Sequence, residues 1–151
     1  MNKEYFMKIA LSLARIAYLK GEVPVGAIVV RDNKIISYAH NMREQTNSPY
    51  SHAEFIAIDK ACRLLNSWRL LDCDVYVTLE PCIMCAGIMQ QSRINRCIYG
   101  TKDPKCGALG SLYNIHKDTR LNHNFEVIPN ILQEECSQIL KDFFKDKRSK
   151  L

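Results

Sequence analysis

Apolar residues in the first part of the chain follow first a helical and then an extended pattern. They recur at helical spacing over residues 6–17, and Gly21 then favours the end of a helix. Two short apolar runs, 25–30 and 35–38, flank Asp32 and Asn33, a pattern typical of a β-hairpin. The same criteria predict the remaining elements, which are a helix over 51–65, a strand over 74–79, a helix over 81–91, a strand over 96–100, a strand over 125–128 and a helix over 131–148.

The order of these elements predicts the fold class. Strands that alternate with helices favour a sheet covered on both faces, so we expect an α/β fold with three layers, α/β/α. No linker or repeat divides residues 1–151, and we therefore expect a single domain. Residues 101–124 lack a regular pattern; this segment is either a functional connection or includes a short helix over 111–115.

The composition excludes several classes of protein. The chain has 151 residues, of which 47% are hydrophobic and 25% charged, values typical of soluble globular domains. The longest stretch without an acidic or basic side chain covers the 12 residues 81–92, whereas a membrane-spanning helix needs about 20. Charged residues near the N-terminus, among them Lys3 and Glu4, argue against a secretory signal. We therefore expect a cytoplasmic protein that does not enter a membrane.

Positive charge is concentrated towards the C-terminal end. The net charge is +5, and residues 141–151 contribute five basic and two acidic side chains, or +3 of that total. Such a cluster favours binding of an anionic polymer such as nucleic acid. It is equally typical of a solvated helix end that the helix dipole stabilises. Charge alone leaves both interpretations open.

Two clusters of potential metal ligands stand where helices are predicted to start. His52 and Glu54 belong to the first cluster, and Cys82 and Cys85 form a Cys-x-x-Cys pair in the second. In a chain without an export signal thiols stay reduced, which favours a metal or redox role for this pair over a disulfide. Zinc prefers two thiolates and an imidazole among its ligands. We predict that His52, Cys82 and Cys85 bind Zn²⁺.

The number of ligands distinguishes a catalytic from a structural zinc site. A structural site has four protein ligands, and the chain has no second Cys-x-x-Cys or His-x-x-x-His pair. Three protein ligands leave one position for water, whose pKa zinc lowers from ~16 to about 7. Glu54 is close enough in sequence to take a proton from that water and return it to a leaving group. Glu54 is therefore the predicted catalytic residue.

Each cluster also has a simpler structural explanation. Ser51 and Glu54 match a helix capping box, in which Glu54 would only bind backbone N–H groups. A lone histidine such as His52 is more often structural than a ligand, and a lone cysteine pair can be a redox pair. The combination favours catalysis, because His-x-Glu followed by Pro-Cys-x-x-Cys is the pattern of the zinc deaminases.

Further motifs extend this pattern into a family resemblance. HAE at 52–54 and TLEPCIMCAG at 78–87 resemble the cytidine-deaminase superfamily. The similarity continues in GEVPVGAIVV at 21–30, SRI at 92–94, GALGSL at 107–112, LNHNFEV at 121–127 and DFF at 142–144. From about residue 21 to residue 148 the chain is similar to the bacterial tRNA-specific adenosine deaminases. The resemblance implies a cytidine-deaminase-like fold in which helices flank a central mixed five-stranded sheet.

The resemblance also implies a reaction and partners. The expected reaction is zinc-dependent hydrolysis of adenosine to inosine and ammonia at the wobble position of a tRNA anticodon, that of tRNA-Arg with an ACG anticodon. An anticodon loop presents unstacked bases, so a tRNA anticodon stem-loop is the expected partner. The family is also homodimeric. The helix face of Ile83, Ile88 and Met89 is a candidate interface, although such a stripe is more often core.

The family's substrate-binding positions are carried over residue by residue. Asn41 and the backbone of Ala53 would bind the flipped base, and the positions near the substrate nucleotides are Asp103, Asn122, His123 and Phe144. Taken alone, these residues suit other roles: Asn41 a turn, Asp103 a cap and Phe144 the core. The chain departs from the family pattern at residues 42–45, MREQ, where a small or proline-containing stretch is usual. This departure concerns contacts with the anticodon loop, not the zinc chemistry.

Two other functions stay open. A deaminase of free nucleosides, nucleotides or nucleobases would use the same zinc site, and only the extended similarity and the basic C-terminal end favour tRNA over it. A structural zinc module that binds RNA or protein without catalysis is the second alternative. In such a module Glu54 would have no role beyond capping a helix.

Overall fold

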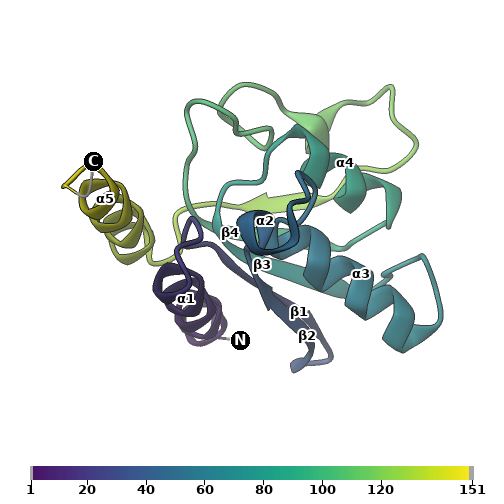
Figure 1. The fold of residues 1–151 in the computed structure, drawn as a ribbon. Helices are drawn as coiled ribbons and strands as arrows, with labels where there is room; N and C mark the ends of the chain where they lie inside the picture. Colours follow the sequence, from purple (N-terminus) through teal and green to yellow (C-terminus); the bar gives the residue numbers. More distant parts are fainter. Residues whose placement is uncertain (1, 150–151) are drawn as a thin grey trace.

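Five strands form one mixed sheet in the order β2-β1-β3-β4-β5 (Figure 1). The strands are β1 (Gly26–Arg31), β2 (Lys34–His40), β3 (Cys73–Leu79), β4 (Arg96–Thr101) and β5 (Glu126–Ile128). β1 pairs antiparallel with β2 and β3, whereas β4 is parallel to both β3 and β5. The computed structural model describes residues 2–149, so Lys150 and Leu151 of the basic end lie outside the described residues. The predicted mixed five-stranded sheet is confirmed.

Helices cover both faces of this sheet, as the element order predicts. They are α1 (Lys3–Leu19), α2 (Arg43–Thr46), α3 (Ala53–Leu65), α4 (Ile83–Gln91), the 3-10 helix η1 (Ile115–Lys117) and α5 (Gln133–Ser149). α1 and α5 lie on one face, and α3 and α4 lie on the other (Figure 1). Among residues 2–149 no helix is both long enough and apolar enough to cross a membrane.

The central strands contribute alternate side chains to two separate cores. Val29 and Val75 pack under α3 and α4, whereas Ile28 and Tyr76 pack under α1. Successive side chains of a strand point to opposite faces, so a strand covered on both sides reads as a continuous apolar run. This explains why the strands are recognisable in the sequence as uninterrupted apolar segments. Each fully buried large side chain contributes roughly 1.5–3 kcal/mol to this packing.

Several boundaries differ from the predictions. The last helix begins at Gln133 instead of residue 131, because Asn130 and Leu132 have φ angles of 66° and 55°, outside the helical region. The possible helix over 111–115 is wrong, and the regular turn in this segment is η1. The short helix α2 was not predicted at all. The hairpin prediction is confirmed: Asp32 and Asn33 have φ angles of 51° and 63°, as a two-residue turn of type I′ requires.

The segments that form the site described below lie along one edge of the sheet, the edge formed by the ends of the central strands. Gly26 pairs with His40 and Leu79 with Thr101, so β2, β3 and β4 end at this edge and β1 begins there. The connections at this edge come from four separate parts of the sequence, and α3 and α4 start from two of them. The topology therefore gathers residues that are up to about 80 positions apart.

The contact between α1 and β1 leads to a prediction about stability. A Cβ atom on Gly26 would collide with the Ala10 carbonyl oxygen and would lie 2.7 Å from the Ala14 nitrogen. We expect Gly26→Ala to lower the free energy of unfolding by at least about 2 kcal/mol, because α1 has to move away from the sheet. Gly87→Ala is the control, since no atom of residues 2–149 outside the adjoining part of the helix lies within 4 Å of its added Cβ. Urea unfolding of both variants measures the difference, and equal stability would contradict this account of the packing.

Candidate active site

The first turns of α3 and α4 bring the predicted metal ligands together. His52 is the N-cap residue of α3 and Cys82 that of α4, and both have extended backbone conformations with no side-chain cap hydrogen bond. Their side chains are therefore free to point away from their helices. Cys85 lies in the first turn of α4, where the free backbone N–H groups and the helix dipole favour a thiolate.

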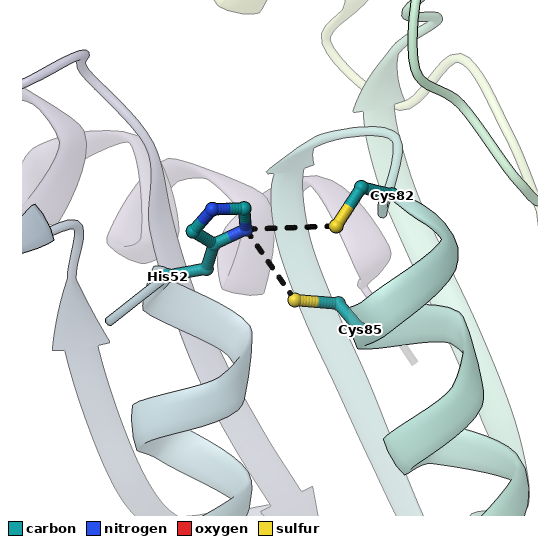
Figure 2. Close-up of side chains that lie close together, drawn as sticks. All are labelled: His52, Cys82 and Cys85. Carbon is teal, nitrogen blue, oxygen red and sulfur yellow. Dashed lines mark hydrogen bonds between the residues drawn. The ribbon is translucent and has the colours of Figure 1, made fainter. Parts of the chain in front are cut away.

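The distances within this cluster fit a metal ion. His52 Nδ1 lies 3.7 Å from Cys82 Sγ and 3.6 Å from Cys85 Sγ, and Figure 2 shows the imidazole directed at both sulfur atoms. All three potential ligand atoms lie within 4.8 Å of one another. In a tetrahedral zinc site, Zn–S bonds of about 2.3 Å and Zn–N bonds of about 2.0 Å separate nitrogen from sulfur by about 3.5 Å. The donor set and its spacing therefore match zinc.

Hydrogen bonds among these three side chains shift their pKa values. A hydrogen bond from Cys85 lowers the pKa of Cys82 to about 4. The same hydrogen bond, together with burial, raises the pKa of Cys85 above that of an ordinary thiol. The pKa of His52 is raised, chiefly by its hydrogen bond with Cys82. Cys82 is thus the more acidic of the two thiols, and binding of a metal ion would require both thiols to be deprotonated.

Glu54 holds a carboxyl group out of water beside this cluster. Its side chain is only 4% exposed, and burial raises its pKa to about 7 while His52 acts in the opposite direction. The capping-box alternative is wrong, because α3 has His52 and not Ser51 as its N-cap residue. The Ser51 hydroxyl instead accepts a hydrogen bond from the Thr46 hydroxyl. Glu54 is therefore not explained as a helix cap.

A cavity of about 560 Å³ lies at this edge of the sheet. This volume is within the range of sites that bind small molecules. Seven of the predicted site residues line it, namely Asn41, His52, Ala53, Glu54, Cys82, Asp103 and Phe144. Cys85 is fully buried behind it. Four basic side chains contact the same cavity and are all exposed, namely Arg43, Lys102, Lys105 and Lys147.

The residues predicted to bind substrate also have local structural roles. The side chain of Asn41 accepts a hydrogen bond from the Arg43 N–H, so it forms the expected turn as well as lining the cavity. Asp103 accepts from the backbone N–H groups of Lys105 and Cys106, so it stabilises a turn over residues 104–106. Phe144 is 44% exposed and is not core.

Two predicted residues lie elsewhere. Asn122 accepts a hydrogen bond of 2.8 Å from the Gln90 side chain, and neither it nor His123 lines the cavity. A ring nitrogen of His123 lies 2.9 Å from the Ile94 carbonyl oxygen, and the ring stacks on Phe125. Both residues thus connect the 121–125 segment to the end of α4 and the residues after it.

Of the three α4 residues of the candidate interface, Ile83, Ile88 and Met89, only some are exposed at the surface. Met89 is fully buried and belongs to the core, and Ile88 packs partly against that core. Ile83, at the start of α4, is 56% exposed. The core interpretation of this stripe is therefore right for Met89, and only its first residue is strongly exposed.

The residue that organises the loop beside the cavity was not predicted from the sequence. Glu80 is 2% exposed, and its carboxylate accepts hydrogen bonds from the backbone N–H groups of Asp103, Leu109 and Ser111. The Ser111 hydroxyl donates a fourth. Gly107 has to be glycine because a Cβ there would collide with this carboxylate. The available signal was an acidic residue directly between an apolar strand and Pro81.

This arrangement agrees with comparisons with known proteins. Residues 1–148 match the family model described as MafB19-like deaminase. The chain belongs to this deaminase family. It is 46% identical over 147 residues to a tRNA-specific adenosine deaminase of Bacillus subtilis, in an alignment that covers 97% of this chain and 91% of the relative.

Solved structures of deaminases share the fold. A tRNA:A34 deaminase, studied for A-to-I editing at the wobble position of transfer RNA, matches with a TM-score of 0.88 and 38% identity. That match covers 91% of this chain and 99% of the other. A guanine deaminase from Bacillus subtilis matches with a TM-score of 0.64 and 38% identity, over 68% of this chain and 66% of the other. The predicted cytidine-deaminase-like fold and deaminase activity are confirmed.

The hydrogen bonds of Glu80 lead to a prediction about the loop over residues 103–111. A glutamine in place of Glu80 keeps the shape of the side chain. Its NH₂ group, however, cannot accept the hydrogen bonds that the backbone N–H groups donate to the carboxylate. We expect Glu80→Gln to lower the free energy of unfolding by about 2–3 kcal/mol, since hydrogen bonds to a buried charge are lost. We also expect faster hydrogen exchange at the amides of Leu109 and Ser111. Glu126→Gln, at the exposed first position of β5, is the control. Unchanged exchange at both amides would contradict the role assigned to Glu80.

Proposed function

We propose that this deaminase is zinc-dependent and converts adenosine to inosine at the wobble position of a tRNA anticodon, that of tRNA-Arg with an ACG anticodon. The observation that carries the proposal is the buried carboxyl group of Glu54, which lines one cavity together with His52 and Cys82 of the His52, Cys82 and Cys85 cluster. The names of the relatives support the choice of substrate, as does their similarity over nearly the whole chain.

The proposed roles divide binding of the metal from movement of protons. His52, Cys82 and Cys85 would hold one zinc ion, which when bound supplies a Lewis acid that activates water. Glu54 takes the two protons of that water in turn: the first goes to the purine ring, and the second, after the oxygen has bonded to the ring carbon, goes to the departing amino group. The sum is adenosine and water giving inosine and ammonia, so Glu54 ends each cycle in the state in which it began.

The cavity supplies groups for an RNA substrate. Asn41 and the backbone of Ala53 are the proposed contacts of the flipped base, and Asp103 and Phe144 those of the neighbouring nucleotides. Exposed lysines at the cavity would contact phosphate groups, which makes binding weaken as salt increases. Asn122 and His123, which do not line the cavity, are proposed to contact nucleotides outside it.

We also propose a homodimer, in keeping with the family resemblance. Exposed apolar side chains support it: Ile83 is 56% and Leu112 52% exposed. Their segments are joined, because Cys82 pairs with Gly107 and the Leu112 N–H bonds to the Gly107 carbonyl. Sedimentation equilibrium should give twice the chain mass, and the mass of one chain would contradict the homodimer. Because tRNA is the proposed substrate, we place the reaction in the cytoplasm.

A deaminase of free nucleobases is the second candidate. The similarity to a guanine deaminase favours it, but that match covers only 68% of this chain. A free base has no phosphate groups, and so it would give the lysines at the cavity no role. Turnover of guanine, adenine or adenosine at rates above that of tRNA would favour this candidate.

The proposed function predicts the outcome of one substitution. The zinc-loaded protein should form inosine at the wobble position of a tRNA with an ACG anticodon, measured by sequencing of the product. Glu54→Gln should lower the rate at least about 100-fold, because a general acid–base contributes 10²–10⁴-fold, while the variant stays folded and keeps its zinc. Glu126→Gln is the matched control.

The other outcomes are informative. No inosine from a folded, zinc-loaded protein would contradict the substrate. A fully active Glu54→Gln variant would contradict the role of Glu54 and favour a non-catalytic zinc module.

A further inference from the structure

Glu22 is a buried carboxylate with no role in the proposed chemistry. Its side chain is 0% exposed, although it borders the catalytic cavity. Its two oxygen atoms accept hydrogen bonds from the backbone N–H groups of Glu44 and Gln45, at 2.9 and 2.7 Å. These are the second and third residues of the one-turn helix α2. Glu22 thus reaches across 22 positions in sequence to cap a helix to which it does not belong.

α2 needs this cap because its own N-cap residue cannot provide one. Met42 occupies the N-cap position and makes no side-chain cap hydrogen bond. An N-cap side chain normally accepts from the second or third N–H group of its helix. The first N–H group, that of Arg43, is bound by the side chain of Asn41 at 3.1 Å. Asn41 and Glu22 therefore share the capping of α2 between them.

The hydrogen bonds from Glu44 and Gln45 to Glu22 form a clamp between two segments of the chain. Both hydrogen-bond partners of Asn41 are adjacent to this clamp. Asn41 Nδ2 donates to the carbonyl oxygen of Val23, the residue next to Glu22. Asn41 Oδ1 accepts from Arg43, the residue next to Glu44. The carboxylate of Glu22 joins these two segments, and so it fixes their separation. With that separation fixed, the Asn41 amide can face only one way. Its NH₂ group has to point to the Val23 carbonyl oxygen, and its oxygen has to point to the Arg43 N–H.

This orientation leaves part of the amide available. A carboxamide has two N–H donors and two acceptor positions, and the two bonds of Asn41 use one of each. One donor and one acceptor remain on a side chain that lines the cavity. A flipped amide would exchange them, and a base edge with a fixed pattern of donors and acceptors distinguishes the two orientations.

We propose that Glu22 is a positioning residue for base recognition: by capping α2 it holds the Asn41 amide in one orientation toward the substrate base. This inference rests on the proposed function through the assignment of Asn41 to the base. It gives a physical reason for a buried charge at the rim of the cavity. The proposal also gives a function to residues 42–45, where the sequence departs from the family pattern. Glu22 and Asn41 bind the backbone N–H groups of this segment.

The test is a double-mutant cycle on the zinc-loaded protein. kcat/KM for inosine formation is measured for the parent chain, Glu22→Gln, Asn41→Ala and the combination, with Glu126→Gln as control. We expect Glu22→Gln to lower kcat/KM at least about tenfold, and the combination to fall no further than Asn41→Ala. Independent losses that multiply in the combination would overturn the proposal, as would full activity of Glu22→Gln.

A second measurement separates this proposal from the proposed function. The side-chain NH₂ resonances of Asn41 and the amide exchange of Glu44 and Gln45 are followed by NMR, without substrate. We expect both to change in Glu22→Gln and not in Glu126→Gln. If they do not change, the positioning role is wrong even where inosine forms. If they change and the parent chain forms no inosine, the clamp on Asn41 stands and only the assigned substrate fails.

Discussion

The convergence of two helix N-termini is the constraint on which the site depends. α3 and α4 lie on the same face of the sheet and start at the same edge, with His52 and Cys82 as their N-cap residues. An N-cap residue has an extended backbone, so its side chain can leave the helix and meet its counterpart. The two dipoles also favour the anionic thiolate at their meeting point. A shift of either helix along the sheet would separate His52 from both sulfur atoms.

Two buried carboxylates hold the irregular segments against this rigid frame. Glu80 binds three backbone N–H groups of the loop after β4, and Glu22 binds two of the turn after β2. Neither segment has enough regular structure to satisfy its own N–H groups. A carboxylate accepts several hydrogen bonds at once, which makes it suited to fix such a loop. The rim of the cavity is thus ordered by charge, and its base by helix and sheet packing.

Part of the fold and part of the candidate site were predictable from the sequence, and the physical reason differs between elements. The strands and long helices follow from periodic burial, and the proposed metal ligands follow from residue type and spacing. α2 was missed because a single turn with no apolar face has no periodic signal. The start of α5 was misplaced because the apolar residues Ile131 and Leu132 pack against the core without being helical. Glu22 and Glu80 were missed because their partners are backbone groups 22 to 31 residues away, which no local pattern reveals.

X-ray absorption at the zinc edge of the metal-loaded protein distinguishes an open catalytic site from a closed structural one. Zinc in an open site should have two sulfur neighbours at about 2.3 Å and two lighter neighbours at about 2.0–2.2 Å, one of them the imidazole of His52. The second lighter neighbour should change when a substrate analogue is added, because that position is open. Three or four sulfur neighbours, or a coordination shell that no substrate analogue alters, would show a closed structural site and contradict the account.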